Sequence, residues 1–381
     1  YKMQLMRSFE ENDSRAILYV YSFISGADWA DEVARLDRMS KITKQDVVEW
    51  ANKYLGPESY AIIYKREGKD PDEQKIAAPK ITPIVTNRDS QSEFLSEIQT
   101  SQVQPIEPVF VDYKKDMSQF EAQPGIDVLY KKNETNDIFT LIYVFNTGTE
   151  NDPALNLAFN YLSYLGTDKM TAEEIASEMY DIACSFYMNA GANQSSIQIT
   201  GLSENMGKAM EIVEGLIAGA KPDEAILENC KADMLKSRAD AKLNQSRCFG
   251  ALQRYLFYGG DFIRRTTLTD PALQALTSEQ LLAKIGGLMG KQHEVLYYGP
   301  QKEAEVKSAL AEHHKVATDL QPLEKKFSTL LPTDANKVVL AQYDAKQLYY
   351  LQFSNRGEKF DVAADPEITL YNEYFGGGMN T

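Results

Sequence analysis

Side chains suited to metal binding or nucleophilic catalysis are scarce in this sequence of 381 residues, which has three histidines and three cysteines. His293 and Glu294 begin like the H-E-x-x-H pattern of a zinc-binding helix, but the second histidine of that pattern is missing. They also stand at the start of a segment with the composition of a strand. We therefore expect His293 to have a structural role or to be exposed.

The remaining histidines and the cysteines give no stronger signal. His313 and His314 follow Glu312 in a polar segment, and adjacent side chains on a surface helix point in different directions, so no metal site is expected there. No cysteine belongs to a C-x-x-C pair, and buried or idle thiols are expected at Cys184, Cys230 and Cys248. The glycine run at 376–378 lacks the lysine of a phosphate-binding loop, which favours a tight turn.

Composition excludes several classes of protein. Hydrophobic residues make up 43% and charged residues 25% of the chain, which is typical of a folded protein. No stretch approaches 18 apolar residues, so no membrane span is expected. Acidic residues outnumber basic ones by 55 to 40, giving a net charge of −15, and this disfavours nucleic acid as a partner. The length predicts two or three domains.

The first part of the chain, residues 1–66, has the pattern of helices followed by a strand. Thr43 is a candidate N-cap with Asp46 three residues on, and apolar residues then recur at helical spacing until Gly56 and Pro57. The apolar run 60–64 predicts a strand. Residues 67–118 are polar and interrupted by prolines, and we interpret them as a linker between two domains.

The middle part, residues 119–314, has the pattern of a complete α+β unit. A capping box at Thr171 and Glu174 and the proline before Asp223 mark helix starts. Apolar and alternating runs predict strands at 126–131, 138–145, 185–190, 196–201 and 293–298. A polar segment covers about 301–335, and we assign 315–336 to a second linker. Residues 337–381 predict two strands, 338–340 and 348–353, and a helix that starts near Pro366.

An internal repeat connects these parts. Residues 42–48 match 276–282 at an offset of 276 − 42 = 234, and without a gap 61–64 then match 295–298. More weakly, 161–166 match 371–376. We interpret the chain as the end of one α+β copy, a whole second copy and the start of a third. The predicted fold class is therefore α+β, with tandem homologous domains, each a mainly antiparallel sheet packed against helices.

The pattern resembles the pitrilysin/insulinase family of zinc metallopeptidases over nearly the whole chain. The most specific part is the Asn-Thr-Gly-Thr-Glu-Asn run at 146–151, a helix, and then Leu165-Gly-Thr-Asp-Lys-Met-Thr-Ala-Glu-Glu174. In active domains of the family, a strand with a Gly-rich end leads into H-x-x-E-H on a helix, then a Gly-Thr and a capping-box helix. The proline-broken linker and the phrase at 106–110 also resemble the family's join between its two halves.

The resemblance implies that the metal site is missing here. Counting back from Gly166 places Leu157 and Tyr161 at the two histidine positions and Asn160 at the glutamate position. Leucine cannot bind zinc, and neutral asparagine cannot act as the general base. Where the family has its distal glutamate ligand, residues 231–238 offer only Asp233. The third copy is no better, because its matching positions are Glu367, Leu370 and Tyr371.

We therefore expect no catalytic, cofactor-binding or metal-binding residue in this chain, with zinc held in an N-terminal domain of the parent protein. The family's substrate-holding Arg and Tyr would follow the glycine turn, beyond Thr381. The resemblance implies a non-catalytic portion of a zinc endopeptidase that forms part of the wall of a peptide-degrading chamber. Its partners would be peptide or unfolded polypeptide substrates and the remaining domains of the same protein.

Two alternatives stay open. The parent may be a catalytically inactive scaffold or processing-partner subunit of the same family, or the chain may be an unrelated binding protein built from α+β repeats. The sequence opens on Tyr1 rather than methionine, and we interpret it as a fragment. Its localisation, cytoplasmic or periplasmic, is left open for that reason.

Overall fold

A computed structural model describes residues 1–65, 67–68, 77–84, 86–87, 90–323, 328–357 and 359–376. Contacts divide the chain into two units, each considered by itself below. The larger unit comprises Asp112–Thr381 together with Met3–Glu10, and the smaller comprises Glu11–Val111. Among the described residues, no helix is long and apolar enough to cross a membrane.

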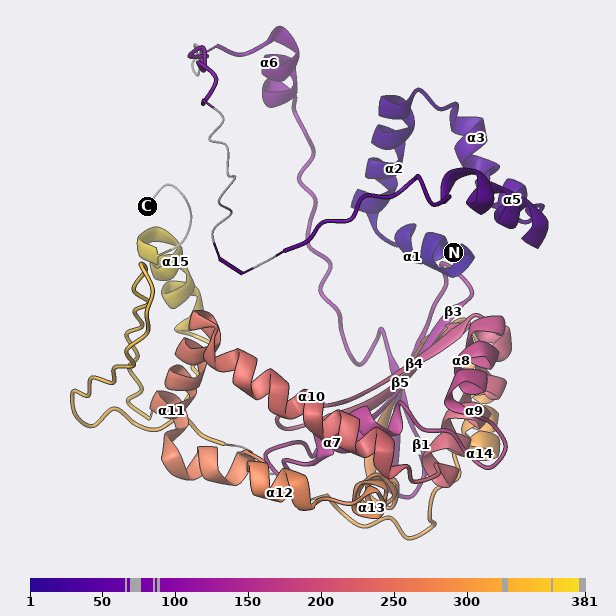
Figure 1. The fold of residues 1–381 in the computed structure, drawn as a ribbon, viewed down its shortest axis with the longest axis vertical. Helices are drawn as coiled ribbons and strands as arrows, with labels where there is room; N and C mark the ends of the chain where they lie inside the picture. The colour runs from indigo at the N-terminus through magenta and orange to yellow at the C-terminus, as the bar shows by residue number, and fades with distance from the viewer. Residues whose placement is uncertain are drawn as a thin grey trace. The chain divides into compact units, whose positions relative to one another are not determined.

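A six-stranded sheet forms the centre of the larger unit (Figure 1). Its spatial order is β1-β2-β6-β3-β5-β4, and all neighbours are antiparallel except β2 and β6, which are parallel. The strands are β1 (Ser118–Gln123), β2 (Ile126–Lys132), β3 (Ile138–Phe145), β4 (Cys184–Ala190), β5 (Ser195–Leu202) and β6 (His293–Gly299). This confirms the predicted α+β fold with a mainly antiparallel sheet.

The two faces of the sheet differ in burial because side chains alternate along each strand. On β3, Phe139, Leu141 and Tyr143 are at most 1% exposed and belong to the main hydrophobic core. The intervening Thr140 and Ile142 are only half-buried. The same alternation holds on β5 and β6, so one face of the sheet carries the core and the other is more open.

Helices supply the other side of this core (Figure 1). The contacts join α7 to β4 and α13, α8 to β4, α9 to β4 and β5, and α14 to α9 and β1. The helices are α7 (Leu155–Leu162), α8 (Ala172–Asp181), the 3-10 turn η1 (Ser203–Asn205), α9 (Met206–Gly219), α10 (Glu224–Lys242), α11 (Gln245–Thr266), α12 (Asp270–Ala275), α13 (Ser278–Met289) and α14 (Glu303–His313).

Local signals in the sequence explain where several helices start. Thr171 and Glu174 form the predicted capping box at the start of α8, with the threonine side chain accepting from the Glu174 backbone N–H. Asp223 caps α10 by accepting from two backbone N–H groups, and Thr43 caps α5. The strands predicted at 126–131, 138–145, 185–190, 196–201 and 293–298 are confirmed within one or two residues.

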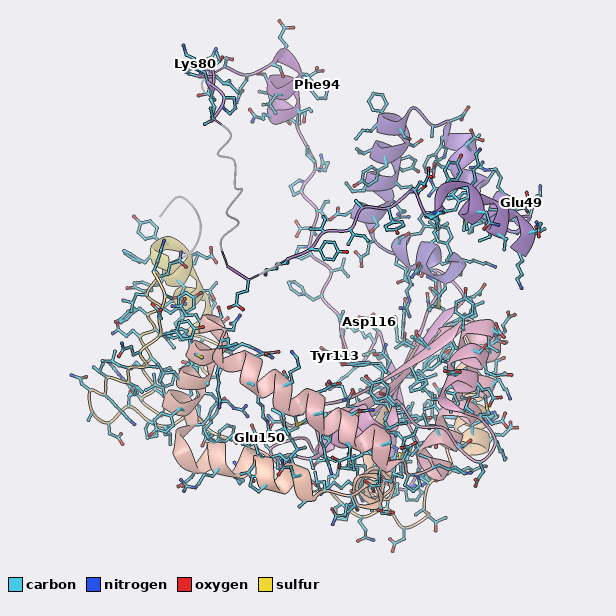
Figure 2. The ribbon with its side chains drawn as sticks, in the orientation of Figure 1. Glu49, Lys80, Phe94, Tyr113, Asp116 and Glu150 are labelled. Carbon is cyan, nitrogen blue, oxygen red and sulfur yellow. The ribbon has the colours of Figure 1, made fainter. Side chains whose placement is uncertain are left out.

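The long helix α11 is bent at Gly259, whose backbone has φ 80° and ψ 174°. Only glycine adopts this conformation without strain. The segment that follows the sheet domain packs on α11: Leu331 donates its backbone N–H to the Phe257 carbonyl, and the rings of Phe257 and Phe353 lie 4.6 Å apart. Glu150, labelled in Figure 2, fixes the start of this segment by accepting hydrogen bonds from the backbone N–H and hydroxyl of Ser328.

Three predicted strands are wrong. Residues 60–64, 338–340 and 348–353 form no ladder, and most of their apolar side chains are exposed. A strand is stabilised by its hydrogen-bonded neighbour, and apolar composition supplies none. The predicted helix near Pro366 is confirmed as α15 (Asp365–Gly376).

The smaller unit is helical at its start and extended beyond. Its helices are α2 (Asn12–Ser25), α3 (Trp29–Val33), α4 (Arg35–Met39), α5 (Lys44–Tyr54) and α6 (Glu93–Thr100), and α1 (Lys2–Ser8) precedes them. The repeat match between 42–64 and 276–298 therefore holds for the helices α5 and α13 but fails for the strand. Apart from α6, the described part of 67–111 is extended and exposed. The domain boundaries remain a prediction.

Candidate functional site

The loop that leads from β3 into α7 is locked against the turn of the β4–β5 hairpin. Thr149 donates its backbone N–H to the Gly191 carbonyl at 2.8 Å, and Glu150 donates to the Ala192 carbonyl at 3.0 Å. Gly148 is required here, because a Cβ at this position would overlap the Gly191 carbonyl oxygen. The Asn-Thr-Gly-Thr-Glu-Asn run thus has a structural reason in this chain: it sets the position of α7.

Leu157 and Tyr161, at the two histidine positions of the family motif, point into the core. Both side chains are 0% exposed and belong to the main hydrophobic cluster. The Tyr161 hydroxyl donates to Ser278 Oγ at 2.8 Å and accepts from the Asp223 backbone N–H at 2.7 Å. Tyr161 therefore ties α7 to the starts of α10 and α13.

Asn160 and Asp233 occupy different surroundings, because both are exposed and line one open pocket of about 570 Å³ formed by α7, α10 and α11. The structure thus brings together the positions where the family has its general base and its distal ligand. The same pocket is lined by Cys230, Arg238 and Arg247. Leu157 and Tyr161 do not line it.

The donor chemistry of this pocket does not fit zinc. Asn160 carries no charge, and Asp233 is the single carboxylate in the lining. Burial, with a smaller contribution from Asp233, raises the pKa of the Cys230 thiol, so its metal-binding thiolate form is disfavoured. Arg238 is engaged by Asp270 and by the Leu268 carbonyl. Across the described ranges, no three His, Cys, Asp or Glu side chains are placed to hold a metal ion.

The third copy provides no further site within the described residues. Glu367, Leu370 and Tyr371 all lie on α15, and all three are exposed. The predicted glycine turn at 376–378 continues past Gly376 into residues that lie outside the described ones.

The histidines differ most from their expected arrangement. His314 was expected on a surface helix, but it is 6% exposed and ends α14 as its C-cap. Its Nε2 lies 2.8 Å from Nε2 of His293, and its Nδ1 lies 2.6 Å from Glu214 Oε1. These partners stand 21 and 100 residues away in the chain, so no local spacing could have indicated the cluster. His293 has the structural role that was one of its two expected outcomes.

Comparison with known proteins gives matches among solved structures alone. No family model matches the chain, and no curated protein matches its sequence. The periplasmic protease PqqL from Escherichia coli is 12% identical with a TM-score of 0.47, over 78% of this chain and 30% of that one. A "peptidase M16 inactive domain" from Pseudomonas fluorescens is 16% identical with a TM-score of 0.46, over 57% of this chain and 53% of that one.

A third match is the ferredoxin protease FusC, solved as a mutant in complex with Arabidopsis ferredoxin. It is 13% identical with a TM-score of 0.44, over 76% of this chain and 30% of that one. At 12–16% identity and TM-scores of 0.44–0.47, these matches are likenesses in fold alone. The chain spans about a third to a half of the length of these neighbours.

Proposed function

We propose that this chain is a non-catalytic portion of a zinc endopeptidase of the pitrilysin/insulinase type, in which it forms part of the wall of a peptide-degrading chamber. The observation that carries the proposal is the state of the motif helix α7. Leu157 and Tyr161 are core residues there, and Asn160 is an exposed neutral side chain. Zinc is then held by another domain of the parent protein.

The open face of the sheet supports the wall role. Thr140 and Ile142 on β3, Gln198 on β5 and Leu296 on β6 are half-buried on the face opposite the core. This face combines polar and apolar side chains with the charged Glu294, and Arg7 of α1 lies against it by donating to the Thr200 hydroxyl. Such a surface can lie against an extended polypeptide without binding one sequence tightly. The net charge of −15 further favours basic polypeptides over acidic ones.

Metal content and peptidase activity test the non-catalytic part of the proposal. The purified chain should retain no stoichiometric zinc after dialysis and should cleave no peptide of a quenched fluorescent library. The matched positive control is any active zinc endopeptidase handled identically. One tightly held zinc per chain, together with cleavage that a chelator abolishes, would contradict the proposal.

Peptide binding tests the wall role separately. A fluorescently labelled unfolded peptide rich in lysine should bind, and its anisotropy signal should weaken as salt is raised, because screening reduces the attraction. The control is the same peptide with every lysine replaced by glutamate, which should bind less tightly. Equal affinity for the two peptides, or no binding of either, would overturn the assignment of this chain to a peptide-facing wall.

A further inference from the structure

A buried chain of three ionisable side chains links three elements of the larger unit. Glu214 belongs to α9, His314 is the C-cap of α14, and His293 is the first residue of β6. None is more than 9% exposed. Hydrogen bonds join His314 Nδ1 and Glu214 Oε1 at 2.6 Å, and the Nε2 atoms of His314 and His293 at 2.8 Å.

The hydrogen bond of His293 to the backbone shows which of its ring nitrogens is protonated. His293 Nδ1 is 2.7 Å from the Lys291 carbonyl oxygen, which can only accept, so Nδ1 carries a proton. Neutral His293 then has a lone pair on Nε2, and it accepts from His314 Nε2–H. His314 can donate at both nitrogens only as an imidazolium, paired with the Glu214 carboxylate. The cluster is therefore complete with three N–H protons on its four ring nitrogens, and burial makes His293 the neutral ring.

A further proton on the cluster breaks it. Protonated His293 would point an N–H at the N–H of His314 across 2.8 Å, with two like charges and no acceptor between them. Aromatic rings leave little room for either ring to turn away: the His293 ring centroid lies 4.7 Å from that of Phe145, and the His314 centroid lies 4.2 Å from that of Tyr143.

Among the residues that the structure describes, the surroundings supply no compensating negative charge for His293. Burial is the main cause that lowers the pKa of His293 to about 4; the hydrogen bond to the Lys291 carbonyl opposes the shift, and the charge of His314 adds to it. From β3, the ionisable group facing the cluster is Tyr143, whose own pKa is raised well above its usual value by burial and by Glu214. Tyr143 therefore stays neutral across the pH range in which histidines titrate. The carboxylate on α9 is already paired with His314.

The cluster sits where the segment after α14 returns to the sheet. Gln292 donates its backbone N–H to the Gln321 carbonyl at 2.9 Å, and Gln321 donates to the Gly290 carbonyl at 3.0 Å. Inside α14, Val306 and Leu310 are buried. His314 is thus the polar anchor between the end of the helix and this pair of segments.

We propose that the His293–His314–Glu214 chain is an acid-sensitive latch that holds α14 and the segment up to Gln321 against β6 and α9, and releases them when His293 takes up a proton. At neutral pH the latch is closed, because neutral His293 accepts a hydrogen bond from His314, which also donates to Glu214. In acid, His293 binds a proton in the unfolded or opened state but stays neutral in the closed state. Stability of the closed state is therefore present at neutral pH and is lost as pH falls below about 6.5, the ordinary histidine value.

Denaturant unfolding at two pH values measures the latch. With an ordinary pKa of 6.5 in the unfolded state and about 4 in the folded state, moving from pH 7.5 to pH 5 should raise the unfolding equilibrium constant roughly 30-fold through His293. His293→Gln keeps an acceptor near His314 and does not titrate, so this contribution should disappear. The control is His313→Gln, which changes a histidine whose Nε2 lies 3.9 Å from Glu312 Oε2 and which is not part of the cluster. His313→Gln should retain the wild-type response.

The variant comparison decides the proposal in either direction. A pH response in His293→Gln as large as that of wild type would overturn the latch. If His293→Gln does not fold, histidine ring NMR on the unmodified chain replaces it. The expected result is one ring that stays neutral, protonated on Nδ1, down to a midpoint near 4. Midpoints of 6 to 7 for all three rings would overturn the proposal.

Hydrogen exchange tests the release itself. After correction for the intrinsic pH dependence of exchange, the ratio of α14 opening in the wild type to that in His293→Gln should rise about 30-fold from pH 7.5 to pH 5, because that ratio isolates the proton coupling of His293. Amides in the middle of β3 should not show this selective increase. Equal protection of α14 at both pH values would contradict the latch.

Discussion

Tyr161→Phe is the sharpest test of the structural role assigned to the motif helix. The substitution removes one hydroxyl and leaves the ring in its place in the core. It breaks the hydrogen bonds to Ser278 Oγ and from the Asp223 backbone N–H. If Tyr161 ties α7 to α10 and α13 in this way, stability must fall even though no apolar contact is lost.

The size of the stability loss depends on whether Ser278 and Asp223 find new hydrogen-bond partners after the substitution. Ser278 is 0% exposed, and within the described part of the chain its hydroxyl has no other partner, so the substitution leaves a buried polar group unsatisfied. Such a group costs about 1–3 kcal/mol. Asp223 is exposed, so water can replace the bond to its N–H and that loss should be small. We expect a total loss of about 1–3 kcal/mol, most of it at Ser278.

Urea unfolding followed by circular dichroism measures this loss as a lower midpoint with an unchanged slope. Tyr164→Phe is the matched control, because Tyr164 lies three residues along and is 55% exposed. It should change stability by less than about 0.5 kcal/mol. Equal midpoints for the two variants would refute the assignment of Tyr161 as a tie between helices.

Two further pairs of substitutions test the packing of α7 and the bend of α11. Leu157→Ala should lower the free energy of unfolding in urea by about 2–5 kcal/mol, because it leaves a cavity in the core. Asn160→Ala, the control, should change it by less than about 0.5 kcal/mol. A larger effect at Asn160 would contradict its exposed placement. Gly259→Ala should lower the stability of the fold by about 1–3 kcal/mol, because an alanine is strained at this positive φ. The loss is measured as a lower midpoint of thermal unfolding. Its control is Gly286→Ala in α13, where a Cβ meets open space and stability should hold or rise slightly.

Much of the sheet domain could be predicted because its signals are local. The alternation of β5, the apolar run of β3 and the capping box at Thr171 each concern residues close together in the chain. The exposed state of Asn160 and Asp233 and the burial of Tyr161 were not predictable in the same way. They depend on how α10 and α13 pack on α7, which involves residues 62 and 117 positions from Tyr161.

The errors have the same physical origin. The run 60–64 has the composition of a strand, but the described residues provide it with no hydrogen-bonded neighbour. Helix α14 was treated as part of a polar segment because only Val306 and Leu310 are buried in it. The histidine cluster could not be foreseen from spacing, since Glu214 and His314 are 100 residues apart.

The position of β6 has a consequence for how the domain forms during synthesis. β6 lies between β2 and β3 in the sheet, although it is the last of the six strands to be made. Until the ribosome has released His293–Gly299, the nascent chain can hold only the β1–β2 hairpin and a separate β3–β5–β4 group. β2 and β3 each expose an unpaired edge during that interval. The sheet can therefore be completed only after β6 has been made, and until then an intermediate with open strand edges is expected, of the kind that chaperones recognise.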